Sequence, residues 1–253
     1  MLGKLLKYEF KSTARTFLPL YALVIIFSFI LKLSMEIEKY LKVSIFTALL
    51  SIIYAILIIG VIAITFVVIL QQFFKTLLGD EGYLMFTLPV EPYKHIFTKL
   101  ITSFTWVVGS TFVGILSVII LAFSKTIFTD IANILKGIPM DIVVQVLIIA
   151  IFGVISSILM IYASMAIGQL VTGHKVIGSV AAYLGIYFAY QILYSIMLVI
   201  VLAVSPDFFT NIALLNGNVM TVFTIVMSGI QVINSIIYFI ITNYIFKNKL
   251  NLE

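Results

Sequence analysis

The sequence predicts an all-α membrane protein, with six transmembrane helices preceded by a cytosolic amphipathic interfacial helix. Five stretches without a charged residue exceed the ~20 residues that a helix needs to cross the bilayer core, and a sixth is nearly long enough. Of the 253 residues, 63% are hydrophobic and 10% are charged, whereas about 25% of an average soluble domain is charged. Six spans and short loops use almost the whole chain, so we expect one membrane domain, 1–253.

The first segment, 1–15, predicts a basic amphipathic arm. Four basic residues spaced three, four and four positions apart share one stripe of a helix: Lys4, Lys7, Lys11 and Arg15. The other side carries Leu2, Leu6, Phe10, Thr13 and Phe17. We expect the basic side at anionic headgroups and the apolar side among acyl chains. The arm is either a topology anchor or an elbow that couples a cytosolic partner to the first span. Pro19 would break the helix, or begin the next one, between arm and span.

The six predicted spans are separated by charged loops. They cover 16–33, 45–73, 100–123, 142–168, 176–204 and 219–246. An even number of spans places both termini on one side. If that side is the cytosol, ten of the 15 basic residues lie in cytosolic segments and five outside, as the positive-inside rule favours. We therefore predict a multi-pass protein of the cell membrane with both termini cytoplasmic.

The longest polar interruption on the predicted cytosolic side is the loop 74–99. It contains a turn signal, GDEG at 79–82, then an apolar run, and then Pro89 and Pro92. A short helix bearing Leu84, Met85 and Phe86 can bind in a groove of a partner protein. The alternative is a re-entrant or interfacial turn that packs on its own helices.

The chain resembles the permease subunits of ABC-2 type transporters, as found in Gram-positive bacteria. The resemblance covers the whole chain and rests on the basic start MLGKLLKYEF, the six spans and the loop GDEGYLMFTLPVEP. In such permeases the loop between spans two and three carries a coupling helix that docks into the ATP-binding subunit. The docking residues implied here are Asp80, Glu81, Tyr83, Leu84, Met85 and Phe86. The resemblance also implies a second contact at 169–176 and a short helical element in the predicted extracellular loop, 205–218.

The absence of several motifs narrows the possible functions. The sequence has no G-x-x-x-x-G-K-[ST] loop, so ATP and Mg would be bound by a partner ATP-binding subunit and not by this chain. It has no cysteine, which excludes a thiolate zinc site and a cysteine nucleophile. The basic residues are not interleaved with aromatic residues on one face, so the sequence does not suggest nucleic-acid binding. We expect no cofactor, no metal and no catalytic residue in this chain, and a second permease chain, identical or different, as a further partner.

The spans carry no ionisable residue at depth, which argues against a proton-driven carrier. The resemblance implies the membrane-spanning permease subunit of an ATP-driven exporter, and the lack of charge in the spans favours an amphipathic or hydrophobic substrate: an antimicrobial peptide, a lipid or a drug. Two rivals stay open. One is the substrate-binding membrane subunit of an energy-coupling vitamin importer, and the other is a membrane scaffold without a transport role.

Span five carries two different faces. A small-residue face, suited to close helix packing, contains Gly178, Ala182, Gly185 and Ala189. A face about 140° away contains Tyr183, Tyr187, Tyr190 and Tyr194. Tyrosine hydroxyls at depth need polar partners. The tyrosines either take part in ordinary packing or line a central substrate path.

Span six carries a polar stripe on an otherwise apolar helix. Its members are Thr221, Thr224, Ser228, Gln231 and Ser235, with Asn234 alongside. Serine and threonine can bond to carbonyls of their own helix. Gln231 and Asn234 need other partners, so they either form hydrogen bonds between helices or line the substrate path.

Overall fold

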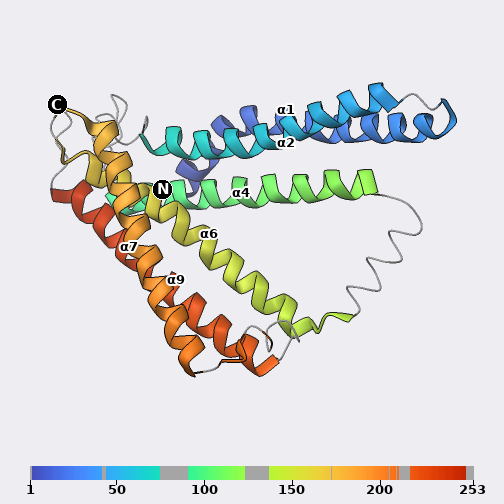
Figure 1. Cartoon of the computed structure of the whole chain (residues 1–253). Coiled ribbons are helices and arrows are strands. Elements are labelled where there is room, and N and C mark those ends of the chain that lie inside the picture. The colour runs from blue at the N-terminus through green and yellow to red at the C-terminus, as the bar shows by residue number, and fades with distance from the viewer. Residues whose placement is uncertain are drawn as a thin grey trace. The chain divides into compact units, whose positions relative to one another are not determined.

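The structure is a computed structural model, and it describes residues 2–41, 44–74, 91–122, 137–171, 173–204, 206–208, 210 and 217–248. Six of its helices are long and apolar enough to cross a membrane, which confirms the predicted all-α membrane fold (Figure 1). In chain order they are α1 (Leu2–Leu41), α2 (Ser44–Phe73), α4 (Pro92–Ala122), α6 (Met140–Gly168), α7 (Lys175–Val204) and α9 (Gly217–Asn248).

The predicted arm and first span form one continuous helix, α1, with Pro19 inside it. The expected break at Pro19 is therefore wrong. Proline removes one backbone hydrogen bond, but Pro19 lies on an exposed side of α1, and Phe17 and Tyr21 on either side of it both contact Trp106. At 1.5 Å per residue the 40 residues of α1 extend about 60 Å, roughly twice the thickness of the hydrocarbon core.

The other helices begin and end close to the predicted spans, except at the start of α4. That helix begins at Pro92, eight residues before the predicted span. Proline suits the first helical position, because the backbone N–H that it lacks would have no partner there. The described helices fall into two compact units. The first unit contains α1, α2 and α4 from Phe97 onward, and the second contains 73–96 with α6, α7 and α9.

The core of the first unit is an aromatic and aliphatic cluster on α1, α2 and α4. Its buried members are Phe17, Tyr21, Val24, Val61, Trp106 and Val113. Phe17 stacks on Trp106 with 4.4 Å between ring centroids. Thus α1 contacts α4 on the same face that carries the apolar residues of the arm.

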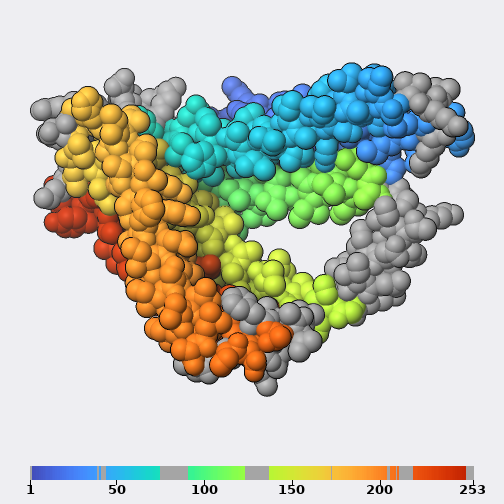
Figure 2. All heavy atoms as spheres, viewed as in Figure 1, coloured from blue at the N-terminus to red at the C-terminus, as the bar shows by residue number. Residues whose placement is uncertain are grey.

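In the second unit, α6 packs along α9 and against α7. The C-terminal half of α6 is the most deeply buried part of that helix, and Tyr162 there is fully buried. Helices α6 and α7 are joined through Gly173, whose φ of 90° lies in the left-handed region that favours glycine. Helix α7 is uncovered over most of its length in the view of Figure 2.

Candidate functional site

A buried ion pair joins the beginning of α1 to the beginning of α4. The Lys99 ammonium donates to the Glu9 carboxylate, and the two side chains are 1% and 14% exposed. The sequence placed Lys99 in the cytosolic loop 74–99, but it lies inside α4. A buried charge pair of this kind fixes two helices in one relative position, because separating them would leave each charge unpaired.

Two turns further along α4, Trp106 contacts α1. The Trp106 indole N–H donates to the Thr13 hydroxyl over 2.7 Å, and Phe10 and Phe17 pack on the same indole. The apolar side of the arm was expected among acyl chains. At Phe10, Thr13 and Phe17 that expectation is wrong, because these residues contact α4. The basic stripe on the other side is exposed, as predicted: Lys4, Lys7, Lys11 and Arg15.

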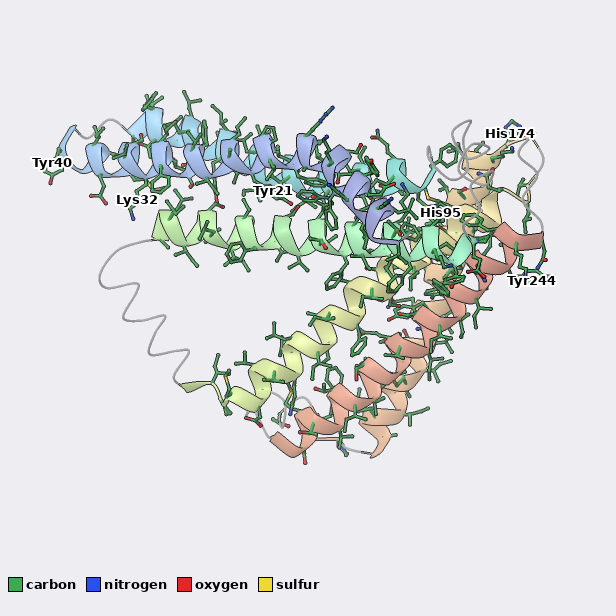
Figure 3. The ribbon with its side chains drawn as sticks, turned by 180° about the vertical axis from the view of Figure 1, so that it is seen from behind. Tyr21, Lys32, Tyr40, His95, His174 and Tyr244 are labelled. Carbon is green, nitrogen blue, oxygen red and sulfur yellow. The ribbon has the colours of Figure 1, made fainter. Side chains whose placement is uncertain are left out.

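Further along the same helices of the first unit, pairs of hydroxyl groups form hydrogen bonds between helices. The Tyr21 hydroxyl lies 2.8 Å from the Ser110 hydroxyl, which lies 2.8 Å from that of Thr65 on α2. Figure 3 shows Tyr21 on the side of α1 that faces α4. Further along, Tyr54 pairs with Ser117 over 2.8 Å. These pairs were not predicted from the sequence. The only signal was the presence of serine, threonine and tyrosine within apolar spans.

We expect Thr13→Val to destabilise the protein by about 1–3 kcal/mol, because it leaves the buried Trp106 N–H without its acceptor at nearly constant side-chain volume. Thermal unfolding in detergent micelles measures the effect. Thr111→Val is the matched control, since Thr111 is exposed and bonds only to Val107 of its own helix. Equal unfolding temperatures for the two variants would contradict a structural role for the Thr13–Trp106 bond.

The predicted docking residues, Asp80 to Phe86, lie outside the described residues, which resume at Glu91. The described chain on either side of them belongs to the second unit. Phe73 stacks on Tyr162 of α6, with 4.0 Å between centroids, and on Phe246 of α9, at 5.5 Å. The last residues of α2 before segment 75–90 are therefore held by three packed aromatic rings, Phe73, Tyr162 and Phe246, which we call the aromatic clamp.

At the other end of that segment, Glu91 and Lys94 form an exposed ion pair over 2.7 Å. The hydrogen bond from Lys94 lowers the pKa of the Glu91 carboxyl. The next residue, His95, lies in the first turn of α4 and is only 2% exposed (Figure 3). His174, between α6 and α7, is exposed.

The tyrosine face of α7 forms two pairs, one tilted and hydrogen-bonded and one stacked. The Tyr190 hydroxyl donates to that of Tyr194 over 2.6 Å. The rings of Tyr183 and Tyr187 stack at 6.4 Å, and Tyr187 is 46% exposed. Adjacent tyrosines therefore contact one another along α7, and their use as a substrate path stays a prediction.

The small-residue face of α7 is close to a neighbour only near its beginning. An added methyl group at Gly178 would meet Val171 at 2.8 Å, whereas one at Gly185 would meet no atom within 4 Å. Ala189 is exposed. Among the described residues, the closest approach at the glycines of this face is therefore at the turn between α6 and α7.

The polar stripe of α9 contacts α6 at two places. The Gln145 amide of α6 donates to the Thr221 hydroxyl over 2.8 Å, and the Gln231 side chain packs against Gly153. Thr224, Ser228 and Ser235 bond to carbonyls of their own helix. Asn234 is half-buried. These contacts agree with packing between helices at Thr221 and Gln231.

Comparisons with protein-family models, with curated proteins and with solved structures find no match to this chain. Among the residues that the structure describes, no cluster of three or more His, Asp or Glu side chains could hold a metal ion. The function is therefore inferred from the helices and their contacts.

Proposed function

We propose that the chain is the membrane-spanning permease subunit of an ATP-driven ABC exporter of the ABC-2 type. It would reside in the cell membrane with both termini cytoplasmic. One observation carries the proposal. The described ends of the segment that joins α2 to α4, 73–74 and 91–96, belong to the second helical unit, whereas α2 before Phe73 and α4 from Phe97 onward belong to the first. A force applied to this segment would therefore reach both units through the chain itself.

The contacts provide a route for such a force. The aromatic clamp fixes the start of the segment to α6 and α9. At its other end, α4 is fixed to α1 by Lys99 and Glu9. An ATP-binding subunit that closes on ATP and pushes on the segment would therefore move four helices. ATP and Mg would be held by that subunit, and this chain would perform no covalent chemistry.

The substrate of this exporter would be amphipathic or hydrophobic: an antimicrobial peptide, a lipid or a drug. The helices expose large apolar side chains along their length. Polar groups suited to an amphipathic substrate lie on α7 and α9. The proposed path residues are Tyr183, Tyr187, Tyr190, Tyr194, Gln231 and Asn234. A second permease chain would complete the path.

Replacement of the apolar docking residues tests the proposal. We expect a variant with Leu84, Met85 and Phe86 all changed to Asp to lose nearly all of the ATP-binding subunit that copurifies with the wild-type chain. Charged side chains cannot enter an apolar groove without losing hydration. An ATP-binding subunit from the same organism would be co-expressed with the chain and quantified on gels.

A matched triple variant controls for general damage. Ile127, Phe128 and Ile131, each changed to Asp, lie between α4 and α6 on the predicted outer side. This variant should retain the ATP-binding subunit. If the docking variant retains it equally well, the proposed docking site is wrong. If the wild-type chain never binds an ATP-binding subunit, the scaffold alternative is favoured.

A further inference from the structure

On α1, the exposed basic stripe is followed by exposed apolar residues on the same side of the helix. These residues are three or four positions apart, and we call them the apolar stripe: Leu18, Ala22, Ile26, Phe29 and Leu33. At 100° per residue, each stripe covers an arc of about 80°, and the centres of the two arcs differ by about 20°. One side of α1 therefore changes from basic to apolar directly after Arg15.

This change falls where the boundary of the hydrocarbon core is expected. No charged residue lies between Arg15 and Lys32. At 1.5 Å per residue, these two residues are about 26 Å apart, close to the ~30 Å thickness of the core. In a helix that crosses the membrane, Arg15 would thus lie at the level of the lipid headgroups, and the apolar stripe would face acyl chains.

The opposite side of α1 is already covered. Glu9, Thr13 and Phe17 contact α4, and they point about 160° away from the centre of the basic stripe. None of the four basic side chains forms an ion pair within the described part of the chain. Their charge is therefore available to a ligand on the side of α1 that faces away from α4.

Pro19 supplies an acceptor at the same level. Proline has no backbone N–H, so Pro19 cannot donate to the main-chain oxygen of Arg15, four residues earlier. This oxygen is therefore not bonded in the usual helical pattern. Pro19 is exposed and lies between the two stripes. A headgroup that carries hydroxyl groups beside its phosphate can donate a hydrogen bond here.

We propose that this side of α1 is a binding site for one anionic phospholipid of the cytosolic leaflet. Lys11 and Arg15, one turn apart, contact the phosphate, and the acyl chains lie along the apolar stripe. A soluble partner reaches the basic stripe but not the apolar stripe, whereas a phospholipid matches both. A zwitterionic lipid is attracted less, because its own ammonium group neutralises its phosphate. The inference rests on the proposed cytoplasmic N-terminus, but it does not require an ATP-binding subunit.

This site differs from the attachment that the sequence predicts for the arm. There, the acyl chains would contact the apolar side of the arm, which includes Phe10 and Phe17. Those residues pack on Trp106 of α4 instead. Headgroup and acyl chains therefore bind one side of α1 in succession, not two opposite sides of the arm.

Thermal unfolding of the purified chain in micelles of an uncharged detergent tests the site. Dioctanoyl phosphatidylglycerol, which is anionic and carries two hydroxyl groups, should raise the unfolding temperature saturably and give an apparent dissociation constant. Lys11→Gln combined with Arg15→Gln should raise this constant about 30-fold, because each basic residue near an anionic headgroup contributes roughly 5-fold. Dioctanoyl phosphatidylcholine, which is zwitterionic, should stabilise the chain much less.

Lys4→Gln combined with Lys7→Gln is the matched control, since it removes the same charge from the same stripe. Both lysines lie about 12 Å or more from Arg15 along the helix, beyond the ~8 Å screening length at physiological ionic strength. The control should therefore leave the dissociation constant nearly unchanged at that ionic strength.

Three results would overturn the proposal. Equal weakening by the two double variants would indicate general attraction to a basic surface, without a site. Equal stabilisation by the two lipids would remove the requirement for negative charge. Equal stabilisation by glycerol 1-phosphate, which has no acyl chains, would indicate a site for a free phosphate. These measurements use the chain alone, so their failure is distinguishable from failure of the ATP-binding subunit to copurify.

Discussion

Lys99→Met should reduce the free energy of unfolding by about 3–5 kcal/mol, because it removes one partner of a buried ion pair and leaves the other charged. The Glu9 carboxylate would then be retained beside an apolar side chain, with little access to water. The methionine side chain is similar in length, so lost packing contributes little. We expect a lower unfolding temperature in detergent micelles and a smaller monodisperse fraction during purification.

Two further variants separate the ion pair from general effects of charge. Adding Glu9→Gln to Lys99→Met should recover much of the lost stability, because no unpaired charge is left in the interior. Lys4→Met removes an exposed lysine from the same arm and should change stability by no more than about 0.5 kcal/mol. If Lys99→Met is no less stable than Lys4→Met, the pair between α1 and α4 does not hold the helices together.

This pair also bears on the two interpretations of the arm. A topology anchor needs only its exposed basic stripe. An elbow needs a firm attachment to a helix that moves with the partner. Glu9 and Thr13 attach the arm to α4, the helix that follows the predicted docking segment. The elbow interpretation is therefore the one that these contacts favour within the proposed function.

Hydropathy alone predicted the positions of the spans, because the thickness of the bilayer sets a minimum length for an apolar helix. Helix α2 ends at Phe73 and α6 at Gly168, as expected. Helix α4 begins before the apolar stretch of the third span, since a helix can continue past the end of its apolar stretch. The break at Pro19 was wrong because contacts on both sides of the proline outweigh one missing hydrogen bond.

Packing partners within the spans could not be predicted for a different physical reason. Lipid and protein interiors are both apolar, so an apolar side chain does not reveal which of them it faces. The sequence therefore did not distinguish buried Phe17 from exposed Leu18, nor did it identify the contact of Thr13 with Trp106.

The second large effect is expected at the turn between α6 and α7. An added methyl group at Gly168 would lie 2.4 Å from the Ser179 backbone nitrogen and 2.5 Å from its Cα. Backbone atoms cannot rotate away as a flexible side chain can. Gly168→Ala should therefore destabilise the protein at or above the upper end of the ~1–3 kcal/mol range that is typical of overpacking.

Gly185→Ala is the matched control for this substitution, because it makes the same change in the same unit where no atom lies within 4 Å. It should be neutral or stabilising by up to about 1 kcal/mol, since alanine favours a helix more than glycine does. The unfolding temperature in detergent micelles should therefore fall for Gly168→Ala and stay unchanged or rise for Gly185→Ala. A Gly168→Ala protein as stable as Gly185→Ala would show that α6 and α7 do not approach this closely.

The turn that joins these helices is also the second predicted contact with the ATP-binding subunit. Loss of that subunit from Gly168→Ala but not from Gly185→Ala would therefore connect the close approach of α6 and α7 to coupling.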